Sequence, residues 1–561
     1  ALRDYIDRND SKTILLTATP YNKQYRDVAN QLGLFLDKDF PLGIQPDHAI
    51  MKTGFDDFYR RCEGKLQTLG AFAKSEEPED WRRLMSMFLV RRTRKFIRDN
   101  YAEIDKEGRH FLRFADGSTF YFPERIAVTL PHIITENDPS NLMTNEETFD
   151  TLDNLNLPRY NVVDYIDNSI EPTKQENAII EDLNRGSGNL IGFTRTMFYK
   201  RLSSCPAAFI LSLQRHLIRN RIFLNAIQND EKLPIGRFDD NNLEDEDPDD
   251  GLPADGYPDG GDPRQWETVA KRAHTSLKKN APKKTRWLRS ELLKASFKKD
   301  LISDIEAIEG LLTLYGTWDQ SNDSKLDALE NLLKTRFPDE KVLIFTEYKD
   351  TAEYVADSLE KRGITKIESV TGSSTDPTAM ARRFSPKANE PIGGLPKETE
   401  ELRILVSTDI LSEGQNLQDA HIVINFDLPW AIIRIIQRAG RIDRVGQRSP
   451  EVFVYTFLPN DDIENIIKLR ERIAVRLKEN AVVIGADERF FGDDSEIRHL
   501  EDLYAGTGVL DGLEDEDEEV DWTSTAYEIW RAATENNDEL ASLVKAIPNV
   551  SLSTKESEPE G

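Results

Sequence analysis

From residue 324 onward the chain alternates short apolar runs with longer amphipathic segments. The runs are four to six residues long, and most of their residues are Val, Ile, Leu or Phe. Runs of this length between helical segments are typical of parallel strands that are buried on both faces. The pattern predicts a doubly wound α/β lobe whose ligands lie at the carboxyl ends of its strands. The expected strands are 342–345, 367–370, 404–407, 422–426 and 452–457.

The segment 437–447, which reads QRAGRIDRVGQ, follows these strands and carries several arginines. Gln437, Gly440, Arg441 and Arg444 are spaced i, i+3, i+4 and i+7, so on a helix they share one face. Guanidinium groups stay charged and bind phosphate oxygens in a bidentate manner. The face therefore predicts a partner that carries phosphate groups. The alternative is a solvated helix with surface arginines.

Five segments, in order along the chain, resemble motifs of the superfamily-two helicases in their Swi/Snf-type form. The resemblance is to bacterial Swi/Snf-type ATPases, among them the RNA-polymerase-recycling type and phage-defence helicases. The chain departs from that pattern at Ala431-Ile432, where Asn-Pro is usual, and in motif III, which reads Tyr-Asn-Lys. The matching segments are 13–23 (motif III), 88–95 (an arginine-rich element), 341–348 (motif IV), 407–418 (motif V) and 437–447 (motif VI).

The resemblance implies a RecA-like lobe and a role for individual residues. Arg441 and Arg444 would stabilise charge on the γ-phosphate of ATP, and Gln437 would position them. Asp409, Glu413, Gly414 and Gly440 would line the nucleotide side. The residues that the resemblance places on nucleic acid are Thr19, Thr371, Ser407, Thr408 and Asn416, although Asn416 is equally suited to polar packing.

The phosphate-binding loop of a P-loop ATPase, GxxxxGK[ST], is absent from the sequence. We therefore expect the C-terminal part of an ATPase, a fragment or a split subunit, whose partner lobe binds ATP and most of the Mg²⁺ ligands. Asp487-Glu488 follows an apolar run, but we expect an ordinary strand or turn there, and we predict no metal site. The expected function is ATP hydrolysis coupled to movement on duplex DNA. The alternative is a non-catalytic nucleic-acid-binding module.

The net charge of −28 is unusual for a nucleic-acid-binding protein. Charge is segregated, however: residues 239–262 and 513–521 are acidic, whereas residues 271–299 are basic. A salt-adapted host is an alternative explanation of the acidity. The sequence has no apolar run of about 20 residues and no signal peptide pattern. Its two cysteines favour a reducing compartment, so we expect a cytoplasmic protein without membrane partners. Besides duplex DNA, RNA polymerase or defence-system proteins are candidate partners.

The composition predicts a largely helical insertion and an acidic tail around the α/β lobe. Within the insertion, residues 192–227 mix apolar side chains with cations, which predicts either core packing or contact with DNA or another lobe. We also expect a β-hairpin over 102–129 that turns at Asp116-Gly117. A capping box of Asp350 and Glu353 should begin a helix that closes near Gly363. The expected divisions are 1–130 (end of a first lobe and connector), 131–233 (helical insertion), 234–265 (acidic linker), 266–323 (basic helical connector), 324–480 (second lobe) and 481–561 (acidic extension).

Overall fold

The computed structural model of the 561-residue chain divides into two compact units. Unit 1 comprises residues 1–112, 476–487 and 501–561, and unit 2 comprises residues 113–475 and 488–500. We describe each unit by itself. The residues that the structure describes are 2–9, 12–15, 25–89, 97–98, 101–115, 117–132, 134, 138, 140–186, 190–235, 258, 263–280, 286–316, 318–390, 399–412, 414–429, 432–459 and 463.

Unit 1 contains a small helical core. Trp81 and Leu84 of one helix pack with Phe72, and all three side chains are fully buried. The carboxylate of Asp80 accepts hydrogen bonds from the backbone N–H groups of His48 and Ala49 at 2.9 and 3.0 Å, which fixes the start of α3. The helices are α1 (Leu2–Arg8), α2 (Tyr25–Leu32), α3 (Asp47–Thr53), α4 (Phe55–Arg61), α5 (Leu69–Phe72) and α6 (Pro78–Phe88).

The motif III and arginine-rich segments lie mostly outside the described residues, which include 12–15, 88 and 89 from these parts of the chain. Thr19 is therefore not placed by the structure. Residues 460–480, except for residue 463, and the acidic extension over 481–561 lie outside the described residues as well. So does the acidic linker, apart from residues 234, 235, 258 and 263–265. The six-part division of the chain stays a prediction.

The predicted hairpin is partly confirmed. β1 (Glu103–Ile104), β2 (His110–Arg113) and β3 (Thr119–Tyr121) form a three-stranded sheet in that order. The prediction is wrong for the second half of the segment, because β4 (Glu124–Thr129) leaves the hairpin. It pairs in parallel with β11 (Glu451–Thr456) at the edge of the large sheet of unit 2. Local sequence shows where a strand is, but it does not show a parallel partner so far along the chain.

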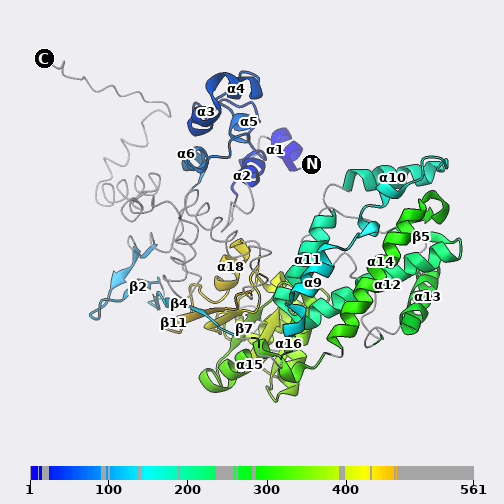
Figure 1. Ribbon diagram of the computed structural model, residues 1–561. Coiled ribbons are helices and arrows are strands. Elements are labelled where there is room, and N and C mark those ends of the chain that lie inside the picture. The colour runs from blue at the N-terminus through cyan, green and yellow to red at the C-terminus, as the bar shows by residue number, and fades with distance from the viewer. Residues whose placement is uncertain are drawn as a thin grey trace. The chain divides into compact units, whose positions relative to one another are not determined.

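Unit 2 is built on a six-stranded parallel sheet, which confirms the α/β fold class. The strand order is β4-β11-β10-β7-β9-β8, and Figure 1 labels β4, β11 and β7 of this sheet. All four residues of β7, β9 and β10 are buried, as expected for central strands covered on both faces. The strands not yet given bounds are β7 (Val342–Phe345), β8 (Ile367–Val370), β9 (Ile404–Ser407) and β10 (Ile422–Asn425).

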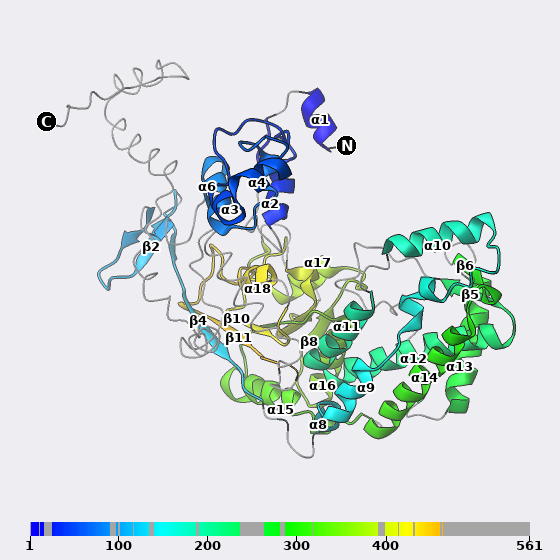
Figure 2. The same cartoon turned by 45° about the horizontal axis from the view of Figure 1, so that its top comes forward.

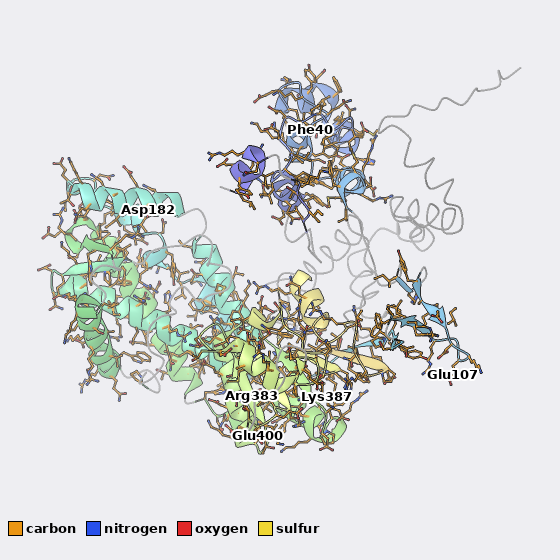
Figure 3. All side chains as sticks on the ribbon, turned by 180° about the vertical axis from the view of Figure 1, so that it is seen from behind. Phe40, Glu107, Asp182, Arg383, Lys387 and Glu400 are labelled. Carbon is orange, nitrogen blue, oxygen red and sulfur yellow. The ribbon has the colours of Figure 1, made fainter. Side chains whose placement is uncertain are left out.

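Helices cover both faces of this sheet. Figure 2 shows α17 (Pro377–Phe384) and α18 (Ile432–Ala439) on the side opposite α15 (Ser324–Asn331) and α16 (Lys349–Lys361). A π-helical turn over Leu332–Arg336 continues α15. At the edge, Arg383 of α17 donates to a Glu368 carboxylate oxygen at 2.5 Å and to the carbonyl oxygen of Glu400 at 3.1 Å (Figure 3).

The described residues between 140 and 322, which belong to the predicted insertion, linker and basic connector, are mostly helical, and we call them together the insertion. Its central helix is α12 (Pro206–Gln228), which packs against α11, α13 and α14 (Figure 1). Asp182 of α10, which is labelled in Figure 3, pairs with Arg286 of β6 at 2.5 Å. The other elements are α8 (Ser140–Met143), α9 (Glu146–Asp153), α10 (Lys174–Gly186), α11 (Leu190–Ser204), α13 (Pro263–Asn280), α14 (Ala295–Tyr315), β5 (Lys232–Ile235), β6 (Arg286–Arg289), and 3₁₀ turns at Pro158–Tyr160, Val162–Tyr165, Ser290–Leu292 and Gln320–Asn322.

A buried ion-pair cluster joins the insertion to the lobe. Arg215 of α12 donates two hydrogen bonds to the carboxylate of Asp350, at 2.6 and 2.8 Å, and Arg201 of α11 donates a third at 2.9 Å. Burial alone would raise the pKa of Asp350, but its hydrogen bonds with the two arginines outweigh burial and hold the pKa below its usual value. Arg201 and Arg215 are therefore buried in the contact between the insertion and the α/β lobe, and contact of the insertion with DNA stays a prediction.

The capping-box prediction is wrong because the Asp350 carboxylate binds the two arginines of the insertion. The N-cap of α16 is Tyr348, which makes no side-chain cap hydrogen bond, and Asp350 lies within the first turn. Its carboxylate is used by two arginines from another part of the chain, which no local spacing rule can show. The predicted end of the helix is confirmed, because Gly363 has a φ of +87° and its N–H donates to the carbonyl oxygen of Glu360.

A second junction contact lies beside the first. Lys325 of α15 is buried, and its ammonium donates to the carbonyl oxygen of Ser204 at 2.8 Å while lying 4.3 Å from the ring centroid of Phe426. Burial lowers the pKa of Lys325 to about 8. The hydroxyl of Ser204 donates to the carboxylate of Asp427 at 2.6 Å. The insertion and the α/β lobe thus share one continuous set of polar contacts as well as a common apolar core.

Candidate functional site

The candidate site lies where the segment after β9 meets the segment after α18. Ser407 ends β9 with its side chain buried, and its hydroxyl donates to the carbonyl oxygen of Thr408 at 2.6 Å. A 3₁₀ turn, Asp409–Leu411, then places the carboxylate of Asp409 toward α18. Arg438 donates to that carboxylate at 2.7 and 3.1 Å, and Arg434 donates at 3.1 Å. Motif V and motif VI, named here by the resemblance, are therefore joined by a salt bridge.

Arg438 is the anchor of this contact and is fully buried. It also donates to the side-chain oxygen of Asn425 at 3.3 Å and to the carbonyl oxygen of Asp427 at 3.4 Å. Burial opposes its charge, but Asp409 outweighs burial and raises the pKa of the guanidinium. A buried arginine with this many acceptors is held in one orientation. The backbone position at which the following loop begins is therefore fixed.

The predicted helical face of 437–444 needs correction. α18 ends at Ala439, and residues 440–446 continue as turns with a φ of +100° at Gly446. The side-chain amide of Gln447 explains the departure from helix, because it donates to the carbonyl oxygens of Ala420 and Ile442, each at 2.8 Å. Side-chain bonds to the backbone hold the loop in a shape that competes with further helical turns.

The arginine loop, residues 440–447, is also fixed from the edge of the sheet. Arg125 of β4 donates to the carboxylate of Asp443 at 2.7 and 3.1 Å. The Asp443 side chain is 4% exposed and that of Arg125 is 15% exposed. An ion pair this well covered fixes the orientation of the loop, since either partner alone would leave a charge in a poorly solvated position.

The arginine loop still brings the two predicted catalytic arginines together. Arg441 and Arg444 donate to the same acceptor, the carbonyl oxygen of Gln415, at 3.5 and 3.3 Å. Arg444 also donates to the side-chain oxygen of Asn416 at 3.2 Å. Both arginines are half-buried, and among the described residues Arg444 forms no ion pair with a carboxylate. Two guanidinium groups held side by side in this way suit an anionic ligand with several oxygens.

The other residues predicted on the nucleotide side are placed as follows. Gln437 is half-buried, and its carbonyl oxygen accepts a hydrogen bond from Arg441 at 3.3 Å. Gly414 is exposed with a φ of +72°, a conformation that residues with a side chain rarely adopt. Gly440 begins the turns of the arginine loop. Glu413 lies outside the described residues.

The residues predicted to contact nucleic acid differ in exposure. Thr371 is 2% exposed, and its hydroxyl lies 2.9 Å from that of Ser373, so the structure does not present it to solvent. Ser407 is likewise buried, whereas Thr408 is half-buried. Asn416 takes part in polar packing, because its carbonyl oxygen accepts from Asn389 at 2.9 Å and its side-chain oxygen accepts from Arg444.

Two carboxylates of the site escaped sequence reasoning, although each lies within two residues of the end of an expected strand. Asp427, after β10, accepts hydrogen bonds from the hydroxyls of Thr346 and Ser204 and from the N–H of Glu347. Glu347, after β7, lies 3.6 Å from Arg434, and burial raises its pKa to about 7. Their position at strand carboxyl ends was the available signal. Arg434, Arg438 and Gln447 were also missed.

Among the described residues, no group of three or more His, Cys, Asp and Glu side chains is arranged to hold a metal ion. Within the same residues, no helix is both long and apolar enough to span a lipid bilayer.

Comparison with known proteins agrees with this geometry in part of the chain. Residues 324–446 match the family model described as the helicase conserved C-terminal domain. The "Uncharacterized ATP-dependent helicase YqhH" of Bacillus subtilis is 34% identical over 133 residues, covering 23% of this chain and 21% of the relative. The "Putative ATP-dependent DNA helicase fml2" of Schizosaccharomyces pombe is 30% identical over 182 residues, covering 29% and 21%. The "Putative ATP-dependent RNA helicase MJ1505" of Methanocaldococcus jannaschii is 29% identical over 119 residues, covering 21% and 14%.

Among solved structures, the C-terminal part of the Fun30 ATPase domain covers 68% of this chain and 98% of its own, with 17% identity and a TM-score of 0.31. The chain spans about a fifth of the length of YqhH and of fml2. The resemblance to superfamily-two helicases is therefore confirmed as a helicase C-terminal domain at residues 324–446. These relatives include proteins named as DNA and as RNA helicases, so they leave the choice between the two nucleic acids open.

Proposed function

We propose that this helicase C-terminal domain belongs to a Swi/Snf-type ATPase of superfamily two and completes its active site from one side. The observation that carries the proposal is the convergence of Arg441 and Arg444 on the carbonyl oxygen of Gln415, at 3.5 and 3.3 Å. The partner lobe, in the same polypeptide or in another subunit, supplies the phosphate-binding loop that this sequence lacks. ATP lies between the two lobes, and its hydrolysis drives movement along duplex DNA.

The chemistry assigned to this chain is charge stabilisation. In the transfer of a phosphoryl group to water, negative charge spreads over the oxygens of the γ-phosphate, and arginines supplied from outside the phosphate-binding loop stabilise it. Arg441 and Arg444 provide that charge. Mg²⁺, when bound, neutralises the β- and γ-phosphates. The two arginines fit the phosphate, whereas the described residues offer no cluster to hold the metal, so we assign its ligands to the partner lobe.

Positioning of the arginines falls to residues that do not touch the nucleotide. Arg438 is held by Asp409, and Asp443 is held by Arg125, so the arginine loop is fixed at both of these points. A geometry fixed before the reaction avoids the cost of reorganising the charges during it. Asp409 also lies directly after Thr408 in the chain. Thr408, which we assign to nucleic-acid contact, is therefore adjacent to the salt bridge between Asp409 and Arg438.

Contact with nucleic acid is assigned to the same edge of the lobe. Phosphate contacts are independent of base sequence and position a protein on the strand without reading it. Thr408 and Asn416, both half-buried, are better exposed for such contacts than Thr371 and Ser407. Thr19 would contribute from the first lobe. The proposal also places the protein in the cytoplasm. The pathways it fits are genome maintenance, transcription recycling and phage defence.

The test uses the protein together with its phosphate-binding lobe. Arg441→Ala and Arg444→Ala should each lower DNA-stimulated ATP hydrolysis by about 1,000-fold or more, with DNA affinity within about twofold of the parent. The matched control is Arg448→Ala, because Arg448 follows the arginine loop directly and is exposed. Full turnover in both arginine variants would overturn the assignment. Salt-sensitive DNA binding without ATP turnover in the parent protein would favour the non-catalytic module instead.

A further inference from the structure

α13, far from the arginine loop in sequence, has two faces of opposite character. Trp266, Ala270 and His274 are buried, at 0%, 1% and 2% exposure, and they pack the helix against α12. The opposite face is cationic: the helix carries five Lys and Arg residues against one carboxylate, Glu267. All five cations are exposed, namely Arg264, Lys271, Arg272, Lys278 and Lys279. We call this set the α13 basic face.

The helical period explains why these cations form a surface. Positions 264, 271 and 278 follow one another at seven-residue intervals, and positions 272 and 279 lie one step around the helix, so all five fall within about a third of its circumference. The buried residues occupy the other side. At about 1.5 Å per residue, the stripe from 264 to 279 is roughly 22 Å long.

The insertion holds α13 firmly, so its basic face is presented as a rigid surface. His274 lies 3.2 Å from the carboxylate of Glu231, to which Lys278 also donates. The His274 ring packs against Trp287 of β6, with centroids 6.1 Å apart. Burial lowers the pKa of His274, so this buried side is held neutral. The helix therefore adds cations to the surface without a charge in its packing face.

The positive charge of the α13 basic face exceeds the negative charge of the carboxylates that are paired with it. Lys271 pairs with Glu267 at 2.6 Å, but both side chains are more than half exposed, so water screens the pair. Among the described residues, Arg272 and Lys279 form no ion pair. In a chain whose net charge is −28, a face with this charge balance is a localised exception. Five exposed cations on one face, with a single carboxylate on the same helix, match the phosphates of a nucleic-acid backbone.

We propose that the α13 basic face is a second nucleic-acid-binding surface, which holds the phosphodiester backbone outside the lobe's own contact edge. This inference rests on the proposed function, because it assigns the insertion to the same nucleic-acid substrate. Backbone contacts of this type bind any sequence and release condensed counterions, so their signature is salt dependence. The ion-pair cluster at Asp350 joins α11 and α12 to the lobe, and α13 packs on α12. A strand held by α13 would therefore be carried along when the lobe moves.

The test compares a variant in which cations of the α13 basic face are replaced by neutral side chains with a matched control. Lys271→Gln, Arg272→Gln and Lys279→Gln together remove three cations but leave Lys278 and its contact with Glu231 in place. The control removes three exposed lysines elsewhere in unit 2, Lys298, Lys299 and Lys361, also by Gln. Affinity for a 30-base-pair duplex is measured from 50 to 300 mM NaCl, with DNA and RNA duplexes as separate arms.

The α13 variant should bind duplex at least tenfold more weakly at low salt, and its plot of log affinity against log salt should be less steep by about 2 to 3. The control should keep the parent's affinity and slope, and circular dichroism should match in all three proteins. Loss in both arms supports a backbone site; loss in one arm supports it and identifies the nucleic acid. Parental affinity and slope in the α13 variant, or equal losses in the control, overturn the inference.

Two further outcomes separate this inference from its premise and from a rival occupant. If the parent turns over ATP with DNA and the α13 variant binds normally, the second surface fails while the proposed function stands. If the parent shows no ATP turnover but the α13 variant loses binding, the proposed function fails while the surface stands. Replacing the carboxylates of 239–250 by amides tests the chain's own acidic segment as occupant. The first result to look for is tighter DNA binding by the parent when its 239–250 carboxylates are replaced by amides. The second is parental DNA binding by the α13 variant whose acidic segment is intact. Both results together would overturn nucleic acid as the partner.

Discussion

The two arginine-rich regions of unit 2 use the same side chain in opposite ways. At the junction with the insertion, Arg201 and Arg215 are 3% and 6% exposed and share the carboxylate of Asp350 through bonds of 2.6 to 2.9 Å. In the arginine loop, Arg444 is half-buried and meets neutral oxygens at 3.2 and 3.3 Å. An arginine buried against a carboxylate fixes architecture. An arginine that meets neutral acceptors keeps charge for an anionic ligand.

The largest expected effect is at the junction. Asp350→Ala would leave two guanidinium groups buried without their carboxylate, so the free energy of unfolding should fall by about 3–5 kcal/mol. Urea unfolding monitored by circular dichroism measures the loss. Glu353→Ala, on the exposed side of the same helix, is the control and should change the free energy by about 0.5 kcal/mol or less.

A compensated variant shows whether the junction charges themselves are needed. Replacing Asp350 by Leu and both Arg201 and Arg215 by Met removes the charges together, and stability should return to within about 1–2 kcal/mol of the parent. If Asp350→Ala alone costs less than about 1 kcal/mol, the cluster is not a structural anchor and the comparison fails.

The second effect is a pH dependence centred on Glu347. Its pKa is about 7 in the folded protein against an ordinary value of 4.5, so the folded state binds the proton more tightly. That stabilisation is fully present below pH 4.5 and is lost as the pH rises to about 7. Relative to Glu347→Gln, which cannot titrate, the parent should lose about 1–3 kcal/mol across this window. Parallel stability curves for the two proteins would contradict the shifted pKa.

The third effect calibrates an ion pair near the surface. Arg383 and Glu368 pair at 2.5 Å with side chains 17% and 35% exposed. A double-mutant cycle with Arg383→Ala and Glu368→Ala should give a coupling of about 1 kcal/mol or less, because water screens both partners. A coupling as large as the loss in Asp350→Ala would show that burial does not separate the junction from ordinary ion pairs.

The smallest effect on stability is expected where the effect on activity is largest. Arg444→Ala should change the free energy of unfolding by about 0.5 kcal/mol or less, since the side chain donates to neutral oxygens from a half-buried position. Thermal unfolding of the variant against the parent measures this change. A loss above about 2 kcal/mol would place Arg444 with the architectural arginines.

The sequence predicted the parts of the fold that depend on local pattern. The five strands from 342 to 457 and the helices between them were found because their periodicity is written in consecutive residues. β4 was assigned to a hairpin, because nothing in its own six residues shows a partner at β11. For the site, the grouping of Arg441 with Arg444 was correct. The roles of Arg438 and Asp350 were missed because burial of a charged side chain depends on residues far away in sequence.

The pairing of β4 with β11 has a consequence for the order in which the protein is made. Arg125 and Asp443, whose ion pair accompanies this pairing, are 318 residues apart. During synthesis at roughly 5–20 residues per second, β4 leaves the ribosome many seconds before its partner strand exists. Until then the backbone edge of β4 that pairs with β11 is unpaired, and its apolar face is uncovered. The arginine loop, which is held by Arg125, is therefore among the last parts of the lobe to assemble. A chain interrupted before β11 has an unpaired sheet edge, which is a binding site for chaperones.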